Sequence, residues 1–164
     1  MESVESTGKT GERQGSPAPM ARRAETFDIR RTAGRRPMVL LFMPDLETPE
    51  CRSYLQAFEH NRAEYERLEA AVVVVTLGEV PHSAGLPDLP VLSHGEAVFR
   101  GYGLPKGEEA APAVVIVDRY GMVEASFTGE TCADLPAEAR VALRLQGAES
   151  ACPECGVAEG RWQR

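Results

Sequence analysis

Residues 38–51 read MVLLFMPDLETPEC and decide the fold. Their first six residues form a continuous apolar run that Pro44 ends, which is the pattern of a strand buried on both faces of a sheet. Thr48 can then cap a helix whose first turn contains Pro49 and Glu50. A buried strand that leads within a few residues into a long helix favours an α/β domain.

The same alternation of strands and helices continues along the chain. A long helix is expected over 48–70, where apolar side chains recur at helical spacing. The later elements are expected as strands at 71–77 and 91–92, a helix at 95–102, a strand at 114–117, its hairpin partner at 122–127 and a helix at 135–145. Together they predict an α/β fold of three layers, with a central mixed β-sheet flanked by helices, parallel at the crossovers and antiparallel at the hairpin.

Length and charge exclude several classes of protein. The 164 residues suffice for one domain, and the net charge of −7 would repel a nucleic-acid phosphate backbone. The apolar runs stop after six residues, whereas a membrane-spanning helix needs about 20. The first 25 residues also lack the apolar segment of a secretory signal, so we expect a cytoplasmic protein that binds neither nucleic acid nor membrane.

Composition divides the chain into three parts. Residues 1–25 are rich in Gly, Ser, Pro and charged residues and poor in apolar ones, so a disordered leader is expected there. Residues 26–147 are expected to form the folded domain. Residues 148–164 form a tail that contains a Cys-x-x-Cys pair.

The most informative motif lies where the first strand meets the helix. Pro44, Thr48 and Cys51 follow the spacing Pro-x-x-x-Thr-x-x-Cys. Unpaired N–H groups in the first turn of a helix favour negative charge, which lowers the pKa of a thiol there. Three nearby carboxylates would act in the opposite direction: Asp45, Glu47 and Glu50. Position alone fits a buried, inert cysteine equally well.

The motif and its placement resemble the active-site signature of the peroxiredoxins (AhpC/TSA, redoxin), which belong to the thioredoxin-like superfamily. The resemblance extends over about residues 27–146 and includes MVLLFMP, VVVVTLG, LPVLSHGEAVFRGYG and VVIVDRYGMV. It implies a thioredoxin-like fold in which Cys51 is a peroxidatic thiolate that becomes a sulfenic acid. Thr48 would bind the thiolate and substrate, and Pro44 would shield the thiolate from water.

The resemblance also implies substrates and partners. The substrate would be hydrogen peroxide or an organic hydroperoxide, and a thioredoxin-like protein or a small thiol would supply electrons. A homodimer is also expected. The reaction would need no cofactor, because sulfur carries the chemistry.

One position departs from the peroxiredoxin pattern. The family usually has an arginine at the start of the strand at 114–117, where this chain has Pro112, so Arg52 or Arg119 would have to substitute. A proline there is similar to the thioredoxin and TlpA-like thiol–disulfide oxidoreductases, in which a cis-proline faces the reactive cysteine. A cis peptide bond before Pro112 is therefore expected. Tyr54, three residues after Cys51, breaks the Cys-x-x-Cys that such enzymes carry.

The chain contains three further cysteines. Cys152 and Cys155 form a Cys-Pro-Glu-Cys pair in the tail, where many peroxiredoxins place a resolving cysteine, so either thiol is expected to resolve oxidised Cys51. The same pair is similar to half of a zinc knuckle, for which two more ligands would be needed. Cys132 has no motif around it and is expected to be a packing residue rather than a resolving cysteine.

Three hypotheses follow. The leading one is a thiol peroxidase that uses Cys51, with Thr48 and Pro44 shaping the site. The second is a thiol–disulfide oxidoreductase with Pro112 as its cis-proline. The third is a non-catalytic thioredoxin-like module whose tail binds zinc or a partner protein.

Overall fold

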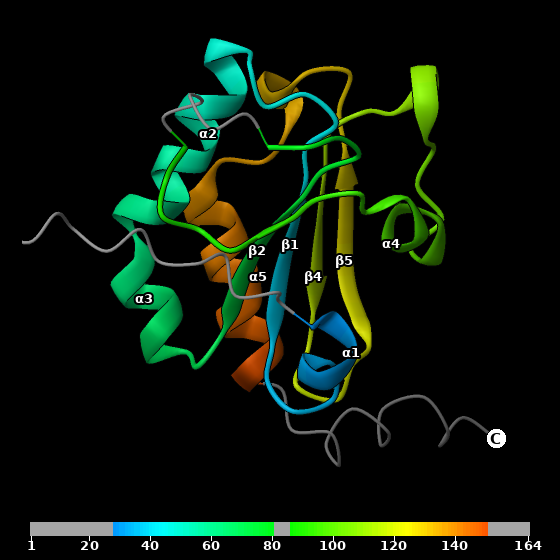
Figure 1. Cartoon of the computed structure of the whole chain (residues 1–164). Helices are drawn as coiled ribbons and strands as arrows, with labels where there is room; N and C mark the ends of the chain where they lie inside the picture. The colour runs from blue at the N-terminus through cyan, green and yellow to red at the C-terminus, as the bar shows by residue number, and fades with distance from the viewer. Residues whose placement is uncertain (1–27, 81–85, 151–164) are drawn as a thin grey trace, which may run out of the picture.

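The computed structural model describes residues 28–80 and 86–150. Five strands form one sheet in the order β3-β2-β1-β4-β5 (Figure 1). The strands are β1 (Met38–Phe42), β2 (Ala71–Val75), β3 (Val91–Leu92), β4 (Ala113–Val117) and β5 (Val123–Thr128). β1 and β3 each pair with β2 in parallel, whereas β4 runs antiparallel to both β1 and β5. The mixed sheet and the hairpin are therefore confirmed.

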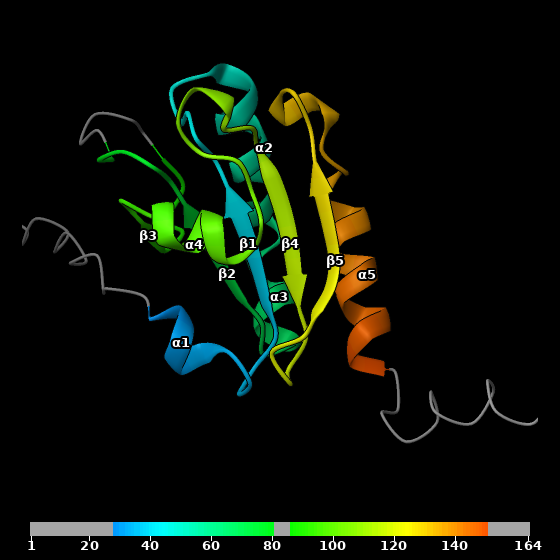
Figure 2. The same cartoon turned by 90° about the vertical axis from the view of Figure 1, so that its right-hand side faces the viewer.

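Helices cover both faces of the sheet and complete the three layers (Figures 1 and 2). One face carries α2 (Pro49–His60), α3 (Arg62–Arg67) and α5 (Glu138–Ser150). The other carries α1 (Ile29–Thr32) and α4 (Glu96–Gly101). Two short 3-10 helices, η1 (Gly107–Glu109) and η2 (Cys132–Asp134), lie in the connections. No helix in the described part of the chain is both long and apolar enough to cross a bilayer.

The central strand explains why its sequence is apolar at every position. Val39 and Leu41 point into the core under α2 and α5, and Leu40 and Phe42 point into the core under α4. All four side chains are fully buried. Successive side chains of a strand face opposite sides, so a strand covered on both faces needs no polar position.

The helix expected over 48–70 is two helices, because the chain turns at Asn61. Asn61 ends α2 with backbone angles of φ −97° and ψ 18°, and its side chain donates a hydrogen bond to Glu138 at 2.9 Å. Asparagine side chains compete with the helical backbone for hydrogen bonds, so this position tolerates the break. The break lets α3 turn toward the start of β2.

Two other boundaries differ from the sequence expectation. The last helix begins at Glu138 and continues to Ser150, past the expected domain end at 147. α1 was not expected, because four residues carry no periodic signal. Asp28 caps it by accepting hydrogen bonds from the backbone N–H groups of Arg30 and Arg31. The expected leader and most of the tail lie outside the described residues, so those domain limits stay predictions.

Candidate active site

Cys51 lies in the first turn of α2, directly beyond the carboxyl end of β1. Thr48 is the N-cap of this helix, and its Oγ1 accepts a hydrogen bond from the backbone N–H of Cys51 at 3.3 Å. Only 7% of Cys51 is exposed. The predicted strand, cap and helix start are therefore present, and they place this sulfur at the positive end of the helix dipole.

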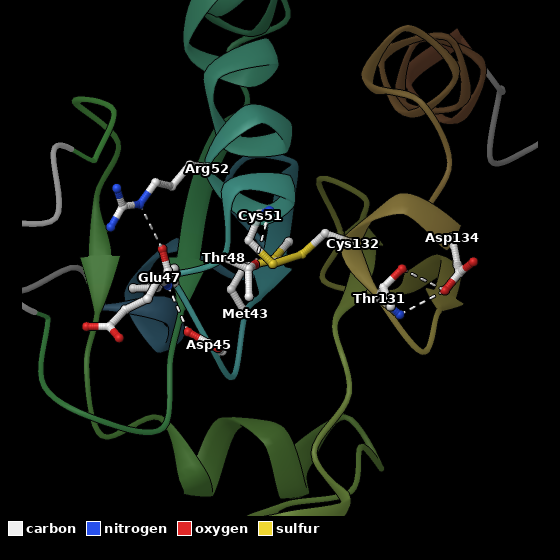
Figure 3. The surroundings of a disulfide bond; sticks show 10 residues. Met43, Asp45, Glu47, Thr48, Cys51, Arg52, Thr131, Cys132 and Asp134 are labelled. Atoms are coloured by element: carbon white, nitrogen blue, oxygen red, sulfur yellow. Dashed lines mark hydrogen bonds between the residues drawn. A yellow bond between two sulfur atoms is a disulfide. The ribbon is translucent and has the colours of Figure 1, made fainter.

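The sulfur of Cys51 is bonded to that of Cys132, which lies in η2 after β5 (Figure 3). The two residues are 81 positions apart in sequence, and their Cα atoms are 5.3 Å apart. The expectation that Cys132 is only a packing residue is wrong, although it is buried. No local motif marks this cysteine, because its partner lies 81 positions earlier in the sequence.

Hydrogen bonds within η2 hold Cys132 in place. The Asp134 carboxylate accepts hydrogen bonds from the backbone N–H and the hydroxyl of Thr131, at 2.8 Å and 3.0 Å. These bonds, with that of the backbone first, hold the pKa of Asp134 below its usual value. The turn that carries Cys132 is thus closed by its own side chains (Figure 3).

Two tyrosines join α2 and α3 to the start of α5: Tyr54 of α2 is half-buried, and Tyr65 of α3 is buried. The Tyr54 hydroxyl donates to the carbonyl of Pro136 at 2.8 Å, and the Tyr65 hydroxyl donates to Glu138 at 2.6 Å. Burial, and then the interaction with Glu138, raises the pKa of both tyrosines. Both therefore remain protonated donors near neutral pH. These two hydrogen bonds join α2 and α3 to the segment that follows η2 and to the first residue of α5.

The loop between β1 and α2 is also held locally. Pro44 is half-buried where β1 ends, and Leu46 beyond it is buried. Arg52 Nε donates to the carbonyl of Leu46 at 3.5 Å, so its guanidinium points toward this loop and away from the disulfide (Figure 3). Arg52 therefore supports the loop and does not contact the sulfur in this disulfide state.

Pro112 lies at the same edge of the sheet as Cys51. It immediately precedes Ala113, which pairs with Phe42 at the end of β1. The described residues contain no cis peptide bond, so the predicted cis bond before Pro112 is wrong. Trans is the ordinary state of an X–Pro bond. The carbonyl of Pro112 accepts a hydrogen bond from the N–H of Gly129 at 3.0 Å, which extends the hairpin pairing.

Arg119 does not replace the arginine that the family usually has. It lies in the turn between β4 and β5, after Val117, and Val117 pairs with Met38 at the opposite end of β1 from Cys51. Its guanidinium pairs with Glu149 of α5. The distance along the sheet excludes Arg119 from the site.

The predicted roles of the tail cysteines concern residues outside the described part of the chain. Cys152 and Cys155 as resolving thiols, and as half of a zinc site, therefore remain predictions. Within residues 28–80 and 86–150, no group of three or more His, Cys, Asp or Glu side chains is arranged to hold a metal ion.

The cap of α2 offers a direct test of this local geometry. Thr48→Val keeps the side-chain volume but removes the oxygen that accepts the Cys51 N–H. We expect it to lower the free energy of unfolding by about 1 kcal/mol in urea titrations. Thr48→Ser, which retains the hydroxyl, is the matched control and should lose much less. Equal losses in the two variants would contradict the capping role.

The fold and the position of its cysteine define a peroxiredoxin-like protein of the thioredoxin-like superfamily. The chain belongs to the AhpC/TSA family, whose model matches residues 18–126. That match includes Cys51 and ends before Cys132. A search of curated protein sequences gives no match.

Solved structures with the same fold are peroxiredoxins of low sequence identity. Reduced 2-Cys peroxiredoxin of Plasmodium vivax has a TM-score of 0.61 at 15% identity, over 75% of this chain and 85% of that one. A cysteine-to-serine variant of Xanthomonas campestris peroxiredoxin Q has a TM-score of 0.63 at 17% identity, with the same coverage. A peroxiredoxin-like protein of Aquifex aeolicus has a TM-score of 0.58 at 22% identity, over 71% and 74%.

Proposed function

We propose that this protein is a thiol peroxidase in which Cys51 attacks the peroxide and Cys132 resolves the product. The observation that carries the proposal is the bond between these two sulfurs at the start of α2. A disulfide that links the first turn of a helix to a short turn at a sheet edge can be reduced and formed again without unfolding the core. The family and the fold support the same reaction class.

The first step would occur at the helix terminus. The Cys51 thiolate attacks one oxygen of the peroxide, the O–O bond breaks, and the leaving alkoxide or hydroxide takes up a proton. Cys51 becomes a sulfenic acid. The N-terminal end of α2 favours the thiolate, and the Thr48 hydroxyl lies beside it to orient the substrate. Pro44 limits access of water to this side of the sulfur.

The second step would form the bond seen in the structure. The Cys132 sulfur displaces the sulfenic oxygen, which leaves as water, and the Cys51–Cys132 disulfide results. Two thiols of a thioredoxin-like protein or of a small reductant then return both cysteines to the reduced state and become a disulfide themselves. Cys152 and Cys155 remain candidates for passing those electrons. A homodimer stays a prediction.

A thiol–disulfide oxidoreductase is the second candidate. The observation in its favour is that the Cys51–Cys132 bond already constitutes a redox pair, with Pro112 at the same sheet edge. Such an enzyme would exchange this bond with a protein dithiol and would not need peroxide. Pro112, the residue that first suggested this class, is preceded by a trans bond.

The decisive experiment adds about one equivalent of hydrogen peroxide to the fully reduced protein and then blocks free thiols. Peptide mass spectrometry is expected to find Cys51 joined to Cys132. The bond should form before the same peroxide oxidises the thiol of an exposed control peptide. With dithiothreitol present, peroxide should be consumed repeatedly. If both cysteines stay reduced while the protein still reduces insulin disulfides, the oxidoreductase replaces the peroxidase.

A further inference from the structure

A methionine sulfur touches the disulfide from inside the core. Met43 follows β1 directly, and its Sδ lies 3.6 Å from Cys132 Sγ (Figure 3). Met43 is fully buried, and 3% of Cys132 is exposed. The Met43 backbone N–H donates to the carbonyl of Val75 at 2.9 Å, so β2 holds this residue at the edge of the sheet.

The disulfide fixes one orientation of the Cys132 side chain, and in that orientation its sulfur also lies beside Met43. A reduced cysteine side chain can occupy three staggered positions about its first torsion angle. The position seen here directs its sulfur at both Cys51 and Met43. The surrounding cluster is otherwise apolar, with Leu46 and Leu135 among its members. In the disulfide neither cysteine sulfur carries a hydrogen, so the 3.6 Å approach of the thioether is a contact between two sulfur atoms; the reduced thiol would have an S–H to donate to it.

Both cysteine-bearing elements remain folded around the disulfide. Thr48 still caps α2, and Thr131 and Asp134 still close η2. The bonded state therefore keeps both helices folded, and the orientation of the Cys132 sulfur is the local feature that the closing step has to set. A group that holds the sulfur in that orientation would raise the rate of disulfide formation.

We propose that Met43 is a positioning residue for Cys132: its thioether accepts the S–H of the reduced thiol and holds the sulfur in line with Cys51. This inference rests on the proposed function and assigns a further residue to its second step. In that step Cys132 loses its proton, its sulfur bonds to Cys51, and the sulfenic oxygen leaves as water. Met43 is unchanged and takes no part in the electron transfer.

The test is Met43→Leu, which removes the sulfur and keeps nearly the same volume, so the core should remain packed. In rapid-mixing experiments with one equivalent of hydrogen peroxide, the loss of the Cys51 thiol should proceed at the wild-type rate. Disulfide closure, measured by acid quench, dimedone labelling of sulfenic acid and mass spectrometry, should slow by about two- to tenfold. The substitution should therefore slow disulfide closure and leave the reaction of Cys51 with peroxide unchanged.

Met38→Leu is the matched control. Met38 is the first residue of β1, the strand that Met43 follows, and is equally buried, but it belongs to the core on the other face of the sheet. It should close at the wild-type rate. If Met43→Leu also closes at that rate, or if the two variants slow closure equally, the positioning role is wrong and the contact is ordinary packing.

A second measurement does not depend on peroxide. With Cys152 and Cys155 replaced by serine, dithiobis(nitrobenzoate) should modify Cys51 first, and Cys132 then expels the second nitrothiolate as the disulfide closes. Met43→Leu should slow only this second release. If peroxide oxidises no variant but this slowing is seen, the peroxidase proposal fails and the role of Met43 stands; equal second phases would overturn that role.

Discussion

Cys51→Ser is expected to abolish peroxide consumption, whereas Cys132→Ser is expected to convert the protein into one that peroxide inactivates. Serine at 51 removes the only nucleophile at the helix terminus, so the rate should fall to that of the buffer. Serine at 132 leaves the first step intact but gives the sulfenic acid no adjacent thiol. Excess peroxide should then drive Cys51 to sulfinic acid, which mass spectrometry detects as two added oxygen atoms.

The tail provides the control for this result. If Cys132 is the partner, the double variant Cys152→Ser/Cys155→Ser should still form the disulfide after peroxide treatment. If a tail cysteine resolves instead, Cys132→Ser would yield a disulfide between Cys51 and the tail, and the double variant would accumulate sulfinic acid. Peptide mapping of the two variants therefore assigns the resolving thiol.

Reducing the disulfide is expected to lower the free energy of unfolding by about 4.5 kcal/mol. The bond joins residues 81 positions apart, and closing a loop of that length restricts the unfolded chain strongly. Urea titrations with and without dithiothreitol should show a lower midpoint for the reduced protein. The melting temperature should fall by about 10 °C or more.

The reduced protein should nevertheless remain folded. Both cysteines belong to a core cluster in which α2 and α5 pack on β1, β2 and β4, and we expect the apolar contacts of this cluster to hold without the bond. Cys132→Ala should behave like the reduced protein and should not respond to dithiothreitol. Coincident titrations of oxidised and reduced wild type would contradict the stabilising role of the disulfide.

Most of the fold could be predicted because its signals are local. The apolar run at 38–43 fits a strand covered on both faces, and Asp118 to Gly121 separates two runs that do form a hairpin. The break at Asn61 could not be predicted, since it depends on a hydrogen bond to Glu138 in α5, 77 residues away. Contacts between distant elements leave no periodic pattern in the sequence.

The candidate site also contains some features that local sequence predicts and others that depend on contacts between distant elements. Thr48 and Cys51 lie in one helical turn, so their spacing alone predicted the cap and the position of the thiol. Cys132 was missed because only the antiparallel return of β4 and β5 brings it beside α2. Pro112 was placed at the correct edge of the sheet, but its isomeric state depends on packing that the sequence does not display.

The bond between Cys51 and Cys132 also changes how the molecule would respond to mechanical force. In the oxidised state, tension applied at the two chain ends bypasses the segment between the cysteines. That segment would yield about 280 Å of contour length if it were free to extend. The contour length of the stretched chain would therefore depend on its oxidation state, because reduction of the disulfide adds the length of this segment.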